Sequence, residues 1–245
     1  MSRETVIVLS VLALVSPSVA AVTPLSIQRV VRVSVESESF PDRPFEHDED
    51  DRSSIEFGSF ENSLQVEVSG AGATAKQTSS VSPQQVSASG FAKANAFSIP
   101  GDIASAATAA STLRYEFSVD VDTPYHIEGY VQGILESTAV LPIDSHITLS
   151  DVDEVLFNVS SAIFTEPELR QGMDTVHFSY AGTLSPGVYT IDAIADQELR
   201  RGAERVQTGS YEFTLTFVPE PTSITNMLFG TLWLAVARRR HIALR

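Results

Sequence analysis

The densest group of side chains able to bind a cation is the run Glu46-His47-Asp48-Glu49-Asp50-Asp51, in which five of the six residues are carboxylates. Calcium prefers several hard oxygen ligands, so this run is a candidate calcium site. Its spacing matches no EF-hand loop, because glycine is absent at the sixth position and no closing glutamate is in register. We therefore interpret the run as a solvated, mobile acidic loop without a defined metal, since its like charges repel one another.

Two smaller acidic groups accompany expected turns. Asp120 and Asp122 flank one turn, and Asp151, Asp153 and Glu154 form a second acidic group further along the chain. Carboxylates gathered at a strand edge can hold a calcium ion. Weak calcium binding therefore stays open as an alternative at these edges, although nothing in the spacing requires it.

Three glutamates on expected strands are candidates for acid–base chemistry: Glu116, Glu128 and Glu212. Glycoside hydrolysis needs two carboxylates a few ångströms apart, with the pKa of one raised by an apolar site. Alternation places all three glutamates opposite the apolar face of their strands, so we expect them to face solvent. Ser179 lies in no Gly-x-Ser-x-Gly turn, so the sequence indicates no serine nucleophile either.

Histidine and cysteine are the other common metal ligands and nucleophiles, and neither forms a recognisable metal or catalytic motif in this sequence. The chain contains no cysteine, which excludes disulfides, thiol nucleophiles and cysteine-held metals. The five histidines show no metal-ligand spacing such as i, i+4 on a helix. They are His47, His126, His146, His177 and His241. We therefore expect no catalytic residue, no cofactor and no metal ligand, and classify the protein as not an enzyme.

Tyrosine and tryptophan rings offer flat faces on which sugar rings can stack. The single tryptophan, Trp233, lies near the C-terminus, and four of the six tyrosines are the main candidates: Tyr125, Tyr130, Tyr189 and Tyr211. Core packing is the expected position of such residues. The alternative is an exposed platform for a sugar, formed by Tyr130 opposite Tyr115.

The elements that position these side chains are short strands. Apolar residues alternate with polar ones over residues 64–68, 113–121 and 213–217, which is typical of half-buried strands. Two hairpins are predicted, one over 175–196 with the turn Leu184-Ser185-Pro186-Gly187 and one joining 112–121 to 125–135. Further strands are expected at 27–36, 56–69, 146–149 and 155–159. No long helix is indicated, although 103–110 could form a short one. The pattern predicts an all-β, antiparallel sandwich or jelly-roll-like body.

Residues 69–112 are rich in Ala, Ser, Gly and Thr, the composition of a flexible linker. Apolar residues nevertheless recur through this stretch, at Val81, Val86, Phe91, Phe97 and Ile99, and can anchor thin strands. We therefore expect one sandwich domain over residues 56–218, preceded by an N-terminal strand and the acidic loop over residues 21–55.

The first 20 residues have the organisation of a secretory signal peptide. Arg3 precedes an apolar run over residues 6–15, which Pro17 and the small-x-small group Ser18-Val19-Ala20 follow. The pattern predicts cleavage between Ala20 and Ala21, and therefore export.

The last 28 residues have three parts in a fixed order: Val218-Pro219-Glu220-Pro221, an apolar stretch, and Arg238-Arg239-Arg240. Together they resemble the PEP-CTERM sorting signal of exported bacterial proteins, which an exosortase processes. The prolines keep the motif extended, as a protease substrate must be. Residues 222–237 reach roughly 24 Å as a helix, marginal for a bilayer core of about 30 Å. The arginines predict a cytoplasmic C-terminus, with residues 219–245 as the sorting tail and its transmembrane segment.

Segments of the body resemble the β-sandwich type found in PEP-CTERM proteins, notably residues 75–81, 87–90, 115–117, 125–129 and 184–189. The resemblance implies an inner-membrane precursor with its body outside, then a product at the cell surface or in the extracellular matrix. The implied partners are the exosortase, the export machinery and, transiently, the inner membrane.

Charge restricts the remaining partners. The chain carries 16 Lys and Arg against 31 Asp and Glu. Five of these basic residues and two of the acidic ones lie outside residues 21–219, which leaves a net charge of −18 on the body. This excess excludes nucleic acid, whose phosphates need clustered basic residues. We expect a structural or adhesive envelope protein. The alternatives are a carbohydrate-binding module for extracellular polysaccharide and a secreted hydrolase.

Overall fold

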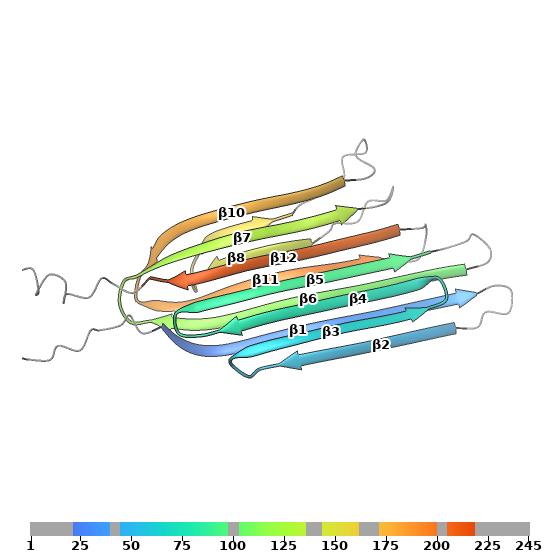
Figure 1. Ribbon diagram of the computed structural model, residues 1–245, viewed down its shortest axis with the longest axis horizontal. Helices are drawn as coiled ribbons and strands as arrows, with labels where there is room; N and C mark the ends of the chain where they lie inside the picture. The colour runs from blue at the N-terminus through green and yellow to red at the C-terminus, as the bar shows by residue number, and fades with distance from the viewer. Residues whose placement is uncertain are drawn as a thin grey trace, which may run out of the picture. The chain divides into compact units, whose positions relative to one another are not determined.

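The computed structural model describes residues 22–39, 45–97, 103–135, 144–161, 172–199 and 205–218. Within these ranges the chain forms twelve β-strands and no helix (Figure 1). The strands are β1 (Val22–Ser39), β2 (Phe45–Ser54), β3 (Ser59–Val68), β4 (Ala71–Val81), β5 (Gln85–Ala96), β6 (Ile103–Val119), β7 (Thr123–Leu135), β8 (Asp144–Ser150), β9 (Val155–Ser160), β10 (Gly172–Leu184), β11 (Gly187–Leu199) and β12 (Arg205–Phe217). In the described part of the chain no helix is long and apolar enough to cross a membrane.

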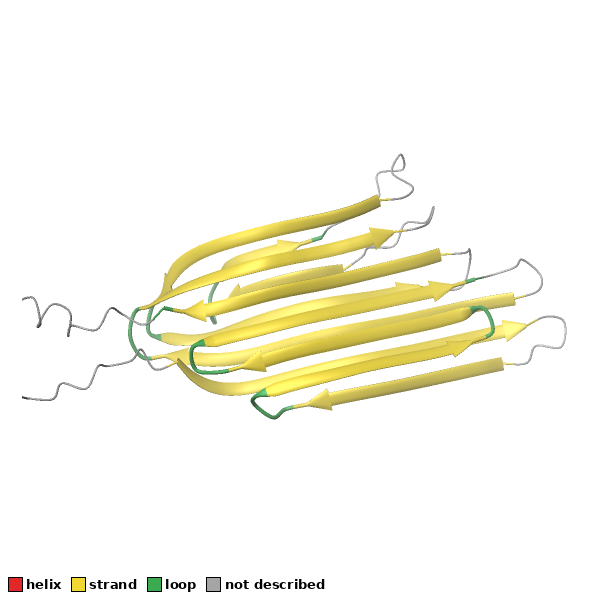
Figure 2. Cartoon of the chain, in the orientation of Figure 1, coloured by secondary structure: helices red, strands yellow, loops and turns green. Residues whose placement is uncertain are grey.

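The strands form two six-stranded antiparallel sheets, which confirms the predicted all-β sandwich (Figure 2). Sheet A has the order β2-β1-β6-β11-β8-β9, and sheet B has the order β10-β7-β12-β5-β4-β3. All twelve strands belong to one compact unit, Ala20–Pro219. The predicted signal peptide, the Ala20/Ala21 cleavage site and the tail from Pro219 onward lie outside the described residues.

Both predicted hairpins have the wrong pairing, although their strands and turns exist. β10 belongs to sheet B and pairs with β7, whereas β11 belongs to sheet A and pairs with β6 and β8. β6 and β7 likewise lie in different sheets. The turns at Leu184–Gly187 and at 120–122 are therefore corners that carry the chain from one sheet to the other. A tight turn reverses the chain locally, but it does not dictate which strand becomes the hydrogen-bonded neighbour.

The small-residue region forms regular strands, as expected, and residues 103–110 begin strand β6 instead of a helix. The acidic run 46–51 differs from the expected loop, because it lies within β2, and this strand pairs with β1 over ten register positions. The sandwich therefore begins at β1, not at residue 56. Backbone hydrogen bonding needs no apolar side chain, and an edge strand leaves its carboxylates in water.

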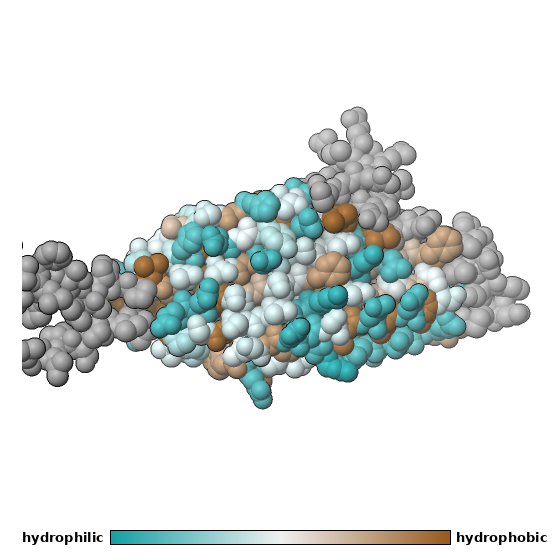
Figure 3. Space-filling view, viewed as in Figure 1, coloured by the Kyte–Doolittle hydropathy of each residue, from teal (hydrophilic) through white to brown (hydrophobic). Residues whose placement is uncertain are grey.

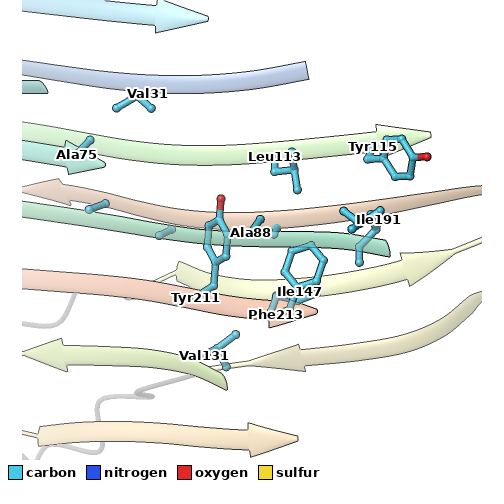
Figure 4. Close-up of a cluster of buried hydrophobic side chains, with 14 of the residues drawn as sticks. Val31, Ala75, Ala88, Leu113, Tyr115, Val131, Ile147, Ile191, Tyr211 and Phe213 are labelled. Atoms are coloured by element: carbon cyan, nitrogen blue, oxygen red, sulfur yellow. The ribbon is translucent and has the colours of Figure 1, made fainter. Parts of the chain in front are cut away.

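The core changes in character along the strands. One end is aromatic, with Phe117 and Tyr189 of sheet A against Phe217 of sheet B. The other end is built from alanine, serine, glycine and glutamine. There a Cβ added at Gly209 would lie 2.3 Å from Gln197 Nε2, so the facing strands leave no room for a larger residue. Figure 4 shows the middle, where Leu113 and Ile191 lie near Tyr211 and Phe213.

Arg29 of β1 is a buried cation that holds the corner between β2 and β3. Its Nη2 donates to the Gly58 carbonyl at 2.7 Å and its Nη1 donates to the Glu56 carbonyl. Its guanidinium lies 5.7 Å from the centroid of the Phe60 ring, a cation–π contact. Burial lowers the pKa of this guanidinium. Arg29 thereby satisfies carbonyls at the point where the chain passes from sheet A to sheet B.

Candidate functional site

Two adjoining hollows on the outer face of sheet B bring aromatic, polar and charged side chains together. One of about 420 Å³ and one of about 470 Å³ share Thr78, Ser89 and Glu212. The first is also lined by Lys76, Phe91, Tyr130, Gln132 and Ser210. In the view of Figure 3, polar and intermediate residues dominate and apolar ones are scattered among them. We call these two hollows together the sheet B groove.

Strand register builds the groove in rows. Tyr130 of β7 lies between His177 of β10 and Glu212 of β12, because both are its register partners. The Tyr130 and His177 rings are 5.8 Å apart between centroids. In the next row Gln132 lies between Thr175 and Ser210, and its Nε2 donates to Thr175 Oγ1 at 2.8 Å. Residues far apart in the sequence are thereby brought onto one surface.

Phe91 continues the row of Gln132 on the far side of β12. It lies on β5, opposite Ser210 on one neighbouring strand and Lys76 on the other. Phe91 and Tyr130 are both half-buried, so each ring is anchored in the sheet while part of it faces solvent. The groove thus combines two aromatic rings with hydroxyl, amide, ammonium and carboxylate groups.

The Tyr130 phenol is held in its neutral form. Partial burial raises its pKa most, and the charge and hydrogen bond of the neighbouring Glu212 carboxylate raise it further, whereas a hydrogen bond with Ser210 lowers it. A neutral phenol beside a carboxylate offers one donor and several acceptors within one row. This is the mixture that sugar hydroxyls require, and the ring supplies a stacking face.

The alternative of a platform formed by Tyr130 opposite Tyr115 is wrong. Tyr115 is fully buried on the inner side of sheet A, where it stacks on Phe117 at 5.4 Å, and burial raises its pKa to about 12. Tyr125, Tyr189 and Tyr211 are also buried, which confirms core packing for them. Tyr211 also lines the groove but is fully buried, so Tyr130 is the one of these four tyrosines that is partly exposed there, together with Phe91.

A cluster that the sequence did not reveal lies on the same face, beside the groove. His126 Nε2 is 2.9 Å from Ser179 Oγ, and His126 Nδ1 is 4.0 Å from a Glu128 carboxylate oxygen. Serine, histidine and carboxylate in this order are the parts of a nucleophilic triad. The second distance exceeds a hydrogen bond, and the His126 and Glu128 side chains are 38% and 59% exposed. Water therefore reaches these groups and screens their charges, whereas acyl transfer needs them in a site from which water is excluded. Only the pairing of β7 with β10 brings them together.

The three candidate glutamates all point away from the core, as predicted. Glu128 and Glu212 are exposed on sheet B, whereas Glu116 lies on the outer face of sheet A, where it accepts a hydrogen bond from Ser26 Oγ at 3.0 Å. None of the three lies in the apolar surroundings that the acid of a glycosidase requires.

The acidic groups are occupied by local interactions. On β2, Arg52 pairs with Asp50, and Glu46 accepts a hydrogen bond from the Ser69 amide at 3.0 Å. Asp151 accepts two 2.7 Å hydrogen bonds, from the amides of Asp153 and Glu154, and so closes the β8–β9 turn. Asp120 and Asp122 are exposed at the corner between β6 and β7. Among the described residues, no three His, Asp or Glu side chains converge as a metal site would require.

The expected sorting motif is described only at its first residue. Val218 is 45% exposed, and its amide donates to the Pro124 carbonyl at 2.8 Å, which ties the end of the sandwich to β7. Pro219, Glu220, Pro221 and the arginines 238–240 lie outside the described residues.

No protein-family model and no curated protein matches the chain. Among the solved structures with distant similarity to this chain are two proteins of different kinds. One is the native structure of a family 35 carbohydrate binding module from Clostridium thermocellum, with 11% identity over 43% of this chain and 76% of that one, at a TM-score of 0.17. The other is the structure of infectious bursal disease virus Gt strain, with 9% identity over 94% of this chain and 76% of that one, at a TM-score of 0.16. At these TM-scores neither similarity bears on ligand or function.

Proposed function

We propose that this protein is an exported, noncatalytic envelope protein with a structural or adhesive role, and that it adheres by binding extracellular polysaccharide in the sheet B groove. The observation that carries the proposal is the row His177–Tyr130–Glu212, in which a neutral, half-buried phenol lies between a second ring and a carboxylate. A sugar ring can stack on the aromatic face while its hydroxyls bond to Glu212 and Gln132.

The shape of the groove favours a chain over a single sugar. Its two hollows adjoin through Thr78, Ser89 and Glu212, so the surface extends across β7, β12, β5 and β4. A polysaccharide laid across these strands would meet Tyr130 and Phe91 in turn. Adhesion through many weak contacts on an open surface suits a protein that holds a matrix together.

Charge favours an uncharged polysaccharide. Lys76 contributes the one cation among the residues that line the groove, against the carboxylates of Glu61 and Glu212. The body as a whole carries −18, which repels anionic polymers. A neutral glycan avoids this repulsion and can still use the hydroxyl, amide and carboxylate groups.

Export and sorting are the second part of the proposal. They are supported by the signal-peptide pattern of residues 1–20 and by the tripartite order of residues 218–240. The exosortase and the inner membrane are the partners that this resemblance to PEP-CTERM proteins implies. The body would then reach the cell surface or the extracellular matrix, where polysaccharide is available.

Affinity gel electrophoresis with embedded neutral polysaccharides, such as a β-glucan, a xylan and a mannan, tests the binding. We expect at least one of them to retard the protein and Tyr130→Ala to abolish the retardation, because the ring is the stacking face. Tyr180→Ala is the matched control, since Tyr180 is 45% exposed but does not line the groove. Absence of retardation by every polymer of a broad glycan array, or equal loss in both variants, would overturn the proposal.

A further inference from the structure

Edge strands expose unpaired backbone groups, and three of the four edges described here carry a protecting feature. β2 has five carboxylates, and β3 has Glu61 and Glu67. β9 is only six residues long, and its ladder with β8 shifts register between Leu149 and Ser150. Charge, shortness and irregularity all discourage another strand from pairing at an edge.

The fourth edge, β10, lacks these features. It is thirteen residues long and pairs with β7 over its whole length without a register shift. It contains no proline, lysine or arginine, and Asp174 is its one carboxylate. β10 is the outermost strand of sheet B in Figure 1, and no described strand pairs with its other side. A long, regularly paired and nearly uncharged edge is a template for a further strand.

The inner side of this edge is apolar and partly open to water. Tyr180 is 45% exposed, and its ring lies 5.9 Å from that of Phe157 on β9. Phe178 is half-buried and lies 5.1 Å from the same Phe157 ring. Val155, also on β9, is 61% exposed. Apolar surface therefore continues up to the unpaired edge, where an added strand would cover it.

We propose that β10 pairs antiparallel with β10 of a second copy of this chain. Charge favours this occupant, because β10 carries only one carboxylate, so two bodies of −18 can pair along this long edge with little local repulsion. Pairing β10 with β2 of another copy would instead place an apolar strand against five carboxylates and remove water from them. Such head-to-tail pairing, which would build open filaments, is disfavoured, and the symmetric pair closes as a dimer.

The dimer has a functional consequence. An antiparallel pair of identical strands has its two-fold axis perpendicular to the sheet, so the outer faces of both copies of sheet B point the same way. Tyr130 lies on β7, the strand next to β10, so the two grooves would adjoin on one continuous sheet. Two linked sites bind one polymer more tightly than either alone. This consequence rests on the proposed function, whereas the pairing itself does not.

Sedimentation equilibrium of the unit Ala20–Pro219 tests the pairing without any glycan. This unit contains every described strand, so it closes its own core. We expect a reversible dimer, whose dissociation constant rises at least about tenfold in Ala181→Lys, because a lysine at this exposed position of an edge strand discourages strand pairing. Gln65→Lys, at an exposed position of the β3 edge, is the matched control and should remain dimeric. A monomer at every concentration would overturn the proposal, as would equal dissociation of both variants.

Disulfide trapping tests the register and does not depend on how Ala181→Lys folds. The chain has no cysteine, so single variants His177→Cys, Ser179→Cys and Ala181→Cys report on this edge alone. A disulfide needs Cα atoms about 4.4–6.8 Å apart, which only residues near the two-fold axis satisfy. We expect covalent dimers to peak at one β10 position and to be absent from Gln65→Cys on β3. Equal yields of covalent dimer from β10 and β3 variants would show that the disulfides form by random collision, and would refute the proposed pairing. If the dimer forms but no glycan binds, the pairing stands and the proposed function fails.

Discussion

The ring of Tyr211 covers Gly90, its direct register partner across β12 and β5. A Cβ added at Gly90 would lie 2.2 Å from the Tyr211 ring and 2.6 Å from Ser111 Oγ. The Tyr211 hydroxyl accepts a hydrogen bond at 3.1 Å from Gln77 Nε2, which also donates to the Thr112 carbonyl at 2.9 Å. One glycine thus makes room for an aromatic residue that ties β12, β5 and β4 of sheet B to β6 of sheet A.

Gly90→Ala should destabilise the body, because the added methyl group must displace the Tyr211 ring. Overpacking of this kind costs about 1–3 kcal/mol, to be measured as the free energy of unfolding in urea. Gly187→Ala is the control, since an added Cβ there meets nothing closer than 3.6 Å. Equal stability of the two variants would show that the ring does not depend on Gly90.

Stability should fall as the pH rises from about 10 to about 12. Burial raises the pKa values of Tyr115 and Tyr211 to about 12, whereas an exposed tyrosine titrates near 10. The unfolded chain therefore releases these protons at lower pH than the folded chain, so the stabilisation is complete below pH 10 and is lost through 12. Urea denaturation across this range measures the slope, and Tyr115→Phe should reduce it. A slope unchanged by that substitution would contradict the assignment.

Ser179 should not behave as an activated nucleophile. Its partner His126 lies 4.0 Å from Glu128, and the cluster is exposed, so neither a fixed carboxylate nor a dry site assists proton removal. We expect no labelling by a fluorophosphonate probe and no ester turnover that Ser179→Ala removes. If the probe labels the protein and both Ser179→Ala and His126→Ala abolish the labelling, the protein is a hydrolase and the noncatalytic proposal is wrong.

Millimolar calcium should leave the melting temperature of the body unchanged. On β2, Asp50 already pairs with Arg52 and Glu46 with the Ser69 amide, and no described group of three ligands converges. An ordered site would raise stability by about 2.7 kcal/mol at a hundredfold excess of ion over its dissociation constant. A calcium-dependent rise that disappears when Asp48, Asp50 and Asp51 become asparagine would establish such a site.

Intact-mass measurement of the protein from its native host tests sorting. We expect a mature chain that begins at Ala21 and ends near residues 219–221, because the prolines keep that segment extended and accessible to a protease. Replacing Pro219 and Pro221 by alanine should leave the tail attached. A mature species that still ends at Arg245 would identify the tail as an ordinary anchor.

The sequence by itself located most of the strands, although not β2, and determined which of their side chains face water. Alternation around Phe213 and Leu215 placed Glu212 on the outer face, and the composition of residues 46–51 correctly predicted exposed carboxylates. These properties are local, because the pleat fixes a period of two and a carboxylate stays hydrated wherever its strand pairs. The two turns were also readable, since proline and glycine set backbone angles within a few residues.

Only the tertiary structure decided which strands became neighbours. The turn at Leu184–Gly187 reads as a hairpin, yet β10 pairs with β7 and β11 with β6, because burying both apolar faces requires the chain to cross between the sheets. That pairing places Ser179 beside His126 and Tyr130 between His177 and Glu212, contacts between strands remote in the sequence. The tertiary structure also buries Arg29 of β1, whose role depends on the carbonyls of Glu56 and Gly58. Register and burial are properties of the whole sandwich, since each strand's place depends on the surface that all the others leave exposed.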